Sequence, residues 1–127
     1  LVIAPNSAVP GVIFEIDLAE RERLDRHEGV GSGYRRDDTF AIEGSTVPAS
    51  SYLGTSLDHT LRPFDWYLAT VIAGAEYHGL ATAHVAALRG TRFVEDTELG
   101  RRTRVEAIEA MREHGIQDYR TLLEGLG

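Results

Sequence analysis

Hydrophobic positions in the first half of the chain fall in short runs separated by turn residues. Four such runs, rich in Val, Ile, Phe and Tyr, are LVIA (residues 1–4), GVIFEI (11–16), TFAI (39–42) and ASSYLG (49–54). Short apolar runs bounded by Pro, Gly, Asn and Ser are typical of β-strands. The pattern therefore predicts four short strands.

A helix is predicted between the second and third of these strands. Asp17, followed three residues later by Glu20, has the layout of a capping box. Gly29 suits the left-handed residue that ends many helices. We therefore expect a helix over Leu18–Glu28.

From Phe64 onward the apolar residues recur with helical spacing. One broad apolar face is formed by Phe64, Tyr67, Leu68, Val71, Ile72 and Ala75. Gly79 supplies a stop, and further helices are predicted over Thr82–Arg89, from about Thr97 to His114, and within Asp118–Glu124. Strands with one inserted helix, followed by helices only, predict an α+β fold. A chain of 127 residues suits one core, so we expect a single domain over residues 1–127.

Charge and composition exclude several classes of function. A formal net charge of -7 and a pI near 5.1 oppose binding to nucleic acid or to an anionic membrane. No apolar run is long enough to span a bilayer. The chain has no cysteine, which fits a reducing compartment, and we expect a cytoplasmic protein without thiol chemistry. None of the five histidines has a metal-ligand spacing, so we expect no metal site.

Glu28, at the end of the first predicted helix, is the candidate chemical group. It shares a helix face with Leu24, so its carboxylate is expected to face a cavity. Partial burial and the negative end of the helix dipole both disfavour the ionised form, which would raise its pKa toward that of a general base. The glycines that follow would let a small substrate approach the backbone. In the alternative interpretation, Glu28 is a solvated last-turn residue followed by a helix cap and a turn.

Two arginines after the glycine-rich stretch also allow two interpretations. Arg35 and Arg36 either attract an acidic substrate or form salt bridges with Asp37 or Asp38.

Two long stretches carry a resemblance to a known superfamily. PGVIFEIDLAERERLDRHEGVGSGYRRDDTFAI (10–42) contains a strand ending G-x-(V/I)-(F/W), a helix with L-D-x-x-E-G and a glycine-linked tyrosine. SYLGTSLDHTLRPFDWYLATVIAGAEYHGL (51–80) adds an S-Y-L strand, a proline-containing connection and a helix with Tyr seven residues before Gly-Ala. In these motifs the chain resembles the gamma-glutamylcyclotransferase superfamily, up to about Gly115.

The resemblance implies a fold, an activity and three site residues. The fold would be a small mixed or antiparallel sheet, or a partial β-barrel, with an inserted helix and C-terminal helices. The activity would be conversion of a small gamma-glutamyl peptide or amine to 5-oxoproline and a free amine, with no cofactor. Glu28 falls on the catalytic glutamate, and Tyr34 and Tyr67 fall on tyrosines that contact the substrate.

One motif of the superfamily has no counterpart in this chain. It is the Tyr-Gly-(Ser/Thr)-Asn loop after the first strand, whose groups hold the substrate carboxylate and the oxyanion. We therefore expect an N-terminally incomplete domain with a free sheet edge, which self-associates or pairs with a complementary N-terminal chain and has little activity alone. Three functions stay open: the enzyme, a catalytically inactive binding or interaction domain of the same superfamily, and a partner-binding module without a small-molecule site.

Overall fold

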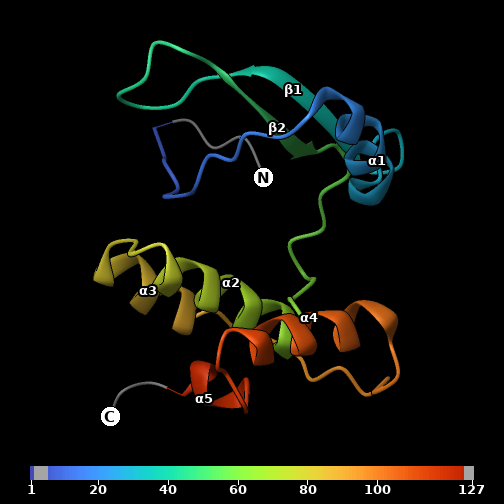
Figure 1. Cartoon of the computed structure of the whole chain (residues 1–127), viewed down its shortest axis with the longest axis vertical. Helices are drawn as coiled ribbons and strands as arrows, with labels where there is room; N and C mark the ends of the chain where they lie inside the picture. Colours follow the sequence, from blue (N-terminus) through green and yellow to red (C-terminus); the bar gives the residue numbers. More distant parts are fainter. Residues whose placement is uncertain (2–5, 125–127) are drawn as a thin grey trace. The chain divides into compact units, whose positions relative to one another are not determined.

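The chain forms two compact units, one built on a two-stranded sheet and the other on helices (Figure 1). This computed structural model describes residues 1 and 6–124. Unit 1 covers Leu1–His59 and unit 2 covers Thr60–Gly127. The predicted α+β class is confirmed. Among the described residues, no helix has the length and apolar character needed to cross a membrane.

The helix of unit 1, α1, spans Leu18–Glu28, as the sequence pattern predicts. Asp17 is its N-cap residue, but the Asp17 side chain makes no capping hydrogen bond, so the expected capping box does not form. Gly29 ends the helix in the left-handed conformation, with φ of 73°. The N–H groups of Gly29 and Val30 donate back to the last turn of α1, which is the Schellman pattern. The helix therefore ends where the glycine allows the chain to reverse.

The sheet of unit 1 consists of β1 (Tyr34–Phe40) and β2 (Ala49–Gly54), which pair antiparallel. β2 matches its predicted strand. β1 begins five residues before the predicted strand at 39–42 and ends at Phe40, so Ala41 and Ile42 were wrongly included. The sequence pattern missed the first half of β1 because residues 35–38 are charged and do not alternate with apolar ones. Cross-strand polar pairs replace that alternation, and Arg36 lies directly opposite Tyr52.

The predicted strand at 11–16 is absent from the described residues. Its apolar side chains are exposed: Val12, Ile13, Phe14 and Ile16. A strand requires a hydrogen-bonded neighbour for its backbone groups, and the described sheet pairs only β1 with β2. Of the predicted strand at 1–4, only the first residue lies within the described part. Leu1 pairs with β2, since its N–H donates to the Tyr52 carbonyl at 3.0 Å and its carbonyl accepts from the Gly54 N–H at 2.7 Å.

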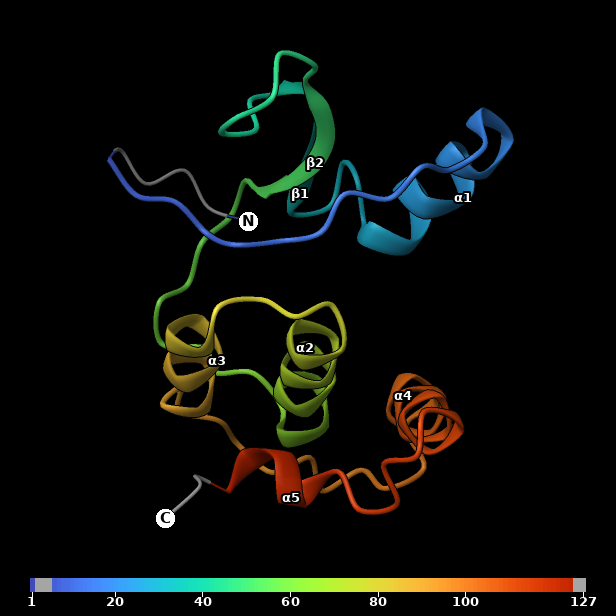
Figure 2. The same cartoon turned by 60° about the vertical axis from the view of Figure 1, so that its left-hand side comes forward.

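Unit 2 contains four described helices: α2 (Asp65–Tyr77), α3 (Thr82–Arg89), α4 (Arg102–Glu113) and α5 (Arg120–Leu123). Figure 2 shows α2 in the centre of this unit, with α3 and α4 on its two sides. One buried cluster joins α2 to α4 and α5, and its members are Trp66, Ala69, Met111 and Tyr119. A second joins α2 to α3, and its members are Leu68, Ile72, Ala75 and Val85. Of the apolar face predicted for α2, Leu68, Ile72 and Ala75 are buried in this core, whereas Tyr67 and Val71 are exposed. The helix is rotated so that Trp66 and Ala69 face the core in their place.

A buried polar network fixes the loop that precedes α4. The Asp96 N–H donates to Asp65 at 3.2 Å, Trp66 Nε1 donates to the Asp96 carboxylate at 2.9 Å, and Arg101 Nε donates to the same carboxylate at 2.7 Å. The Tyr119 hydroxyl donates to Asp65 at 2.7 Å. The hydrogen bond from Arg101, with a smaller contribution from the bond of Trp66, lowers the pKa of Asp96 to about 2. They hold the loop against the start of α2, and α4 therefore begins five residues later than the predicted Thr97.

Replacement of Tyr119 by Phe should destabilise unit 2, because it removes the hydroxyl that donates to the buried Asp65 carboxylate. A buried acceptor that loses its partner costs about 1–3 kcal/mol of unfolding free energy. Urea unfolding followed by fluorescence of Trp66, the chain's single tryptophan, measures this cost. The matched control is Tyr77→Phe, since Tyr77 is 72% exposed. Equal stability of the two variants would contradict the role given to Tyr119.

Candidate active site

Glu28 and Tyr34 lie at the two ends of one tight glycine loop. Glu28 is the last residue of α1 and Tyr34 is the first residue of β1. Between them, Gly29, Gly31 and Gly33 have φ of 73°, 88° and 102°. Side-chain-bearing residues adopt such angles only at a cost in strain. The three glycines therefore reverse the chain within five residues and keep Glu28 close to the start of the sheet.

The backbone of this loop is occupied by its own hydrogen bonds. Four consecutive N–H groups donate to nearby backbone carbonyls, those of Gly29, Val30, Gly31 and Ser32. The expectation that these amides are open to a substrate is therefore wrong for four of the loop's residues. The glycines allow the backbone to turn with positive φ angles. The four bonded amides are not available to a substrate, so its hydrogen-bond donors must come from other groups.

The structure places the three predicted site residues in different surroundings. The Glu28 side chain is exposed, so the expected partial burial is wrong in the described chain. Leu24, which was expected to anchor that face to a core, is itself only half-buried and lines a hollow of about 610 Å³ together with Ile16. Tyr34 is 42% exposed on β1, and Tyr67 is 55% exposed in the first turn of α2, in unit 2. The roles of these residues stay predictions.

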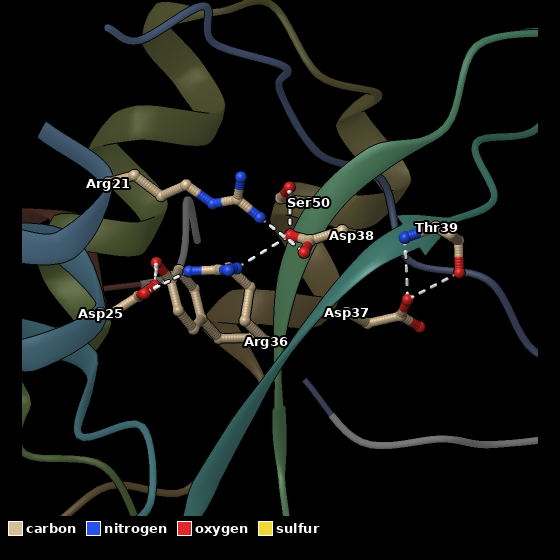
Figure 3. A network of polar contacts seen from close by, with 8 residues as sticks. Arg21, Asp25, Arg36, Asp37, Asp38, Thr39 and Ser50 are labelled. Carbon is tan, nitrogen blue, oxygen red and sulfur yellow. Dashed lines mark hydrogen bonds and ion pairs between the residues drawn. The ribbon is translucent and has the colours of Figure 1, made fainter. Parts of the chain in front are cut away.

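A polar network joins the last turn of α1 to both strands (Figure 3). Asp25, three residues before Glu28, forms an ion pair with Arg36 of β1 through one carboxylate oxygen. Its other oxygen accepts a hydrogen bond of 2.7 Å from the Tyr52 hydroxyl of β2. The last turn of α1 is therefore tied to the centre of the sheet.

The same network continues along β1 to a second point on α1. Arg36 Nε donates to Asp38 at 2.8 Å, which confirms one of the two interpretations of this arginine. Asp38 also accepts from the Ser50 hydroxyl at 2.9 Å and pairs with Arg21 at 2.5 Å. Arg21 and Asp25 lie four residues apart and so on one face of α1. The helix is therefore held to the sheet at two points by one linked set of polar side chains. We call this set the polar seam, and its members are Arg21, Asp25, Arg36, Asp38, Ser50 and Tyr52.

Charges in this seam shift the pKa of Asp25 and of Tyr52 in opposite directions. Bonds from Tyr52 and then from Arg36 hold the pKa of Asp25 below its ordinary value. Burial first, and then the hydrogen bond to Asp25, raise the pKa of Tyr52 to about 12. The negative charge of Glu28 makes a smaller contribution to that rise in the pKa of Tyr52. Asp25 is consequently a carboxylate and Tyr52 a neutral phenol at neutral pH.

The sequence contained a signal for part of this seam. Asp25 is the aspartate of the L-D-x-x-E-G motif and Tyr52 is the tyrosine of the S-Y-L motif, but neither motif indicates that the two side chains meet.

A metal is not suggested by the described side chains, because no three His, Asp or Glu residues among them are grouped as ligands.

A family model decides the relationship of the chain. The model of the AIG2-like family matches residues 8–88, more than half of the chain. The chain belongs to the AIG2-like family. That family is part of the gamma-glutamylcyclotransferase superfamily, as the motifs indicated. The match contains Glu28, Tyr34 and Tyr67. Neither the curated proteins nor the solved structures yielded a significant match.

The polar seam of this AIG2-like protein should make the docking of α1 sensitive to acid. The pKa of Asp25 and of Asp38 lies below the ordinary 3.8 in the folded chain. Such carboxylates stabilise the fold above the unfolded pKa, and the contribution is lost as the pH falls through the folded pKa. We expect α1 amide protection factors, measured by hydrogen exchange, to hold at neutral pH and to fall below about pH 4.

Two variants test whether the seam causes this loss. Asp25→Asn should give weak α1 protection at every pH, because the ion pair with Arg36 is absent. Asp37→Asn should retain the wild-type profile, since the Asp37 carboxylate accepts hydrogen bonds from the N–H and the hydroxyl of Thr39, in the same strand. Undiminished protection of wild-type α1 in acid would show that the seam does not hold the helix.

Proposed function

We propose that this chain carries a gamma-glutamylcyclotransferase site that converts a gamma-glutamyl peptide or amine to 5-oxoproline and a free amine. The observation that carries the proposal is the family match over residues 8–88, which includes the L-D-x-x-E-G motif at 24–29. The position of Glu28 agrees with it, because Glu28 ends α1 beside a loop that leads directly into the sheet. A carboxylate on a rigid helix end is well placed to act on a bound substrate.

The reaction needs one base and no other covalent participant. The Glu28 carboxylate takes a proton from the alpha-ammonium of the substrate, which frees the nitrogen lone pair. The amine attacks the gamma-carbonyl carbon, a carbon–nitrogen bond forms, and the carbonyl oxygen gains the negative charge. As the tetrahedral intermediate collapses, the bond to the leaving nitrogen breaks and protonated Glu28 returns its proton to that nitrogen. The ring nitrogen, which carries two protons after the attack, releases one of them to water. The products are 5-oxoproline and the free amine, and Glu28 is again ionised.

The exposure of Glu28 favours a second candidate, a catalytically inactive binding or interaction domain of the same superfamily. Stabilisation of the oxyanion requires donors aimed at the carbonyl oxygen, and four amides of the glycine loop are already bonded. A chain without further donors would keep the scaffold and lose the reaction. An assay for 5-oxoproline release from gamma-glutamyl-alanine separates the two functions.

In that assay, replacement of Glu28 by Gln should lower turnover at least about 100-fold while the fold is retained. Glutamine preserves the size and hydrogen-bonding reach of the side chain but cannot accept the ammonium proton. The control is Glu22→Gln, which removes the same charge from an exposed position of α1 and should leave turnover within about twofold of wild type. Far-UV circular dichroism checks the fold of both variants.

Two results would count against the proposal. Turnover of Glu28→Gln close to that of wild type removes Glu28 from the role of base. No release of 5-oxoproline by the wild-type chain, at concentrations where gamma-glutamyl-alanine binds, favours the inactive binding domain.

A further inference from the structure

The Tyr52 hydroxyl has a fixed hydrogen-bonding role. A phenol has one proton to donate and lone pairs that accept. Tyr52 Oη lies 2.7 Å from an oxygen of Asp25, and an ionised carboxylate only accepts. The single proton of Tyr52 is therefore committed to Asp25. Toward any other group, the Tyr52 oxygen is left as an acceptor.

Asp25 is held so that this commitment persists. Its second oxygen is paired with Arg36, and Arg36 in turn donates through Nε to Asp38. The side chains of Asp25 and Arg36 are only 20% and 25% exposed. Because each oxygen of the Asp25 carboxylate has its own partner, rotation of this carboxylate would break both contacts, which holds it in place.

The charge beside Tyr52 suits a cation. Arg36 pairs with the carboxylates of Asp25 and Asp38, and Arg21 pairs with Asp38, so these two arginines and two carboxylates neutralise one another. Glu28 follows Asp25, the partner of Tyr52, by about one helical turn and so lies on the same side of α1. An acceptor oxygen with a carboxylate near it is the arrangement that binds a protonated amine.

We propose that Asp25 is a positioning residue that sets the Tyr52 hydroxyl as a hydrogen-bond acceptor for the protonated amino group of an amino-acid substrate beside Glu28. The inference rests on the proposed function and deepens it, because it assigns the recognition of the ammonium that Glu28 is to deprotonate. Tyr52 holds the nitrogen, and Asp25 fixes the direction of the Tyr52 proton.

A pair of unreactive probes isolates this recognition from catalysis. L-glutamate has the alpha-ammonium but no leaving amine, and glutarate is the same diacid without the ammonium. Isothermal titration of the full chain gives the ratio of the two dissociation constants. We expect wild type to prefer L-glutamate by at least about tenfold, the value of one charge-assisted hydrogen bond.

A double-mutant cycle tests the role of Asp25. Tyr52→Phe removes the acceptor and should abolish most of the preference for L-glutamate. Asp25→Asn should have the same effect, because an amide both donates and accepts and so releases the direction of the Tyr52 proton. The double variant should match the single variants. Asp37→Asn, which removes an equal charge from a carboxylate bonded to Thr39, should keep the wild-type preference.

Three results would overturn the inference. One is a wild type that binds glutarate as well as L-glutamate, or binds neither. A second is a preference retained in Tyr52→Phe, a mild change that preserves the ring even if Asp25→Asn disturbs the fold. The third is additive losses in the double variant, since Asp25 would then attract the ammonium directly. Loss of cyclotransferase activity with an intact cycle would reject only the proposed reaction, and activity with a failed cycle would reject only the inference.

Discussion

The ion pair between Asp25 and Arg36 is the contact on which the arrangement of unit 1 depends. α1 buries none of its residues, so apolar packing contributes little to its attachment. A two-stranded hairpin is itself marginally stable in water and needs a partner to cover it. Helix α1 is this partner, and the seam attaches it, because Arg21 and Asp25 on one face of α1 form ion pairs with residues of β1. Ion pairs at exposed sites are weak one by one, and here they act as a linked set with shared partners.

Unit 2 is also organised by a linked set of polar contacts, and in this unit the central carboxylate is buried. The Asp96 side chain is 1% exposed, and its carboxylate receives bonds from Trp66 and Arg101. Removal of any partner would leave a buried charge unsatisfied, which costs more than the bond itself contributes. This network sets the start of α2, and Tyr67 lies in that first turn. In each unit, a residue expected to act on a ligand is therefore positioned by polar contacts made by its neighbours along the chain.

The parts of the structure that could be predicted from the sequence are those with local causes. The bounds of α1 were predicted from Asp17, Glu20 and Gly29, and the end of α3 from Gly90, and these signals need no distant partner. The start of α4 depends on Asp96 meeting Asp65, 31 residues away, and local pattern carries no trace of that bond. The site divides in the same way. Glu28 and its glycine loop were visible in the L-D-x-x-E-G stretch, whereas the bond between Asp25 and Tyr52 joins residues 27 apart.

The glycine loop and the seam have complementary chemical characters, and this difference constrains how a cyclisation could be catalysed. The reaction requires acceptors for an ammonium and donors for an oxyanion. Four loop amides are bonded within the backbone, and Arg36 is shared between Asp25 and Asp38, so these donors are already used. What the end of α1 retains is acceptor capacity, at Glu28 and at the Tyr52 oxygen. The end of α1 is therefore suited to binding and deprotonating the substrate ammonium. Hydrogen-bond donors that stabilise the oxyanion would have to lie on a different segment of the chain.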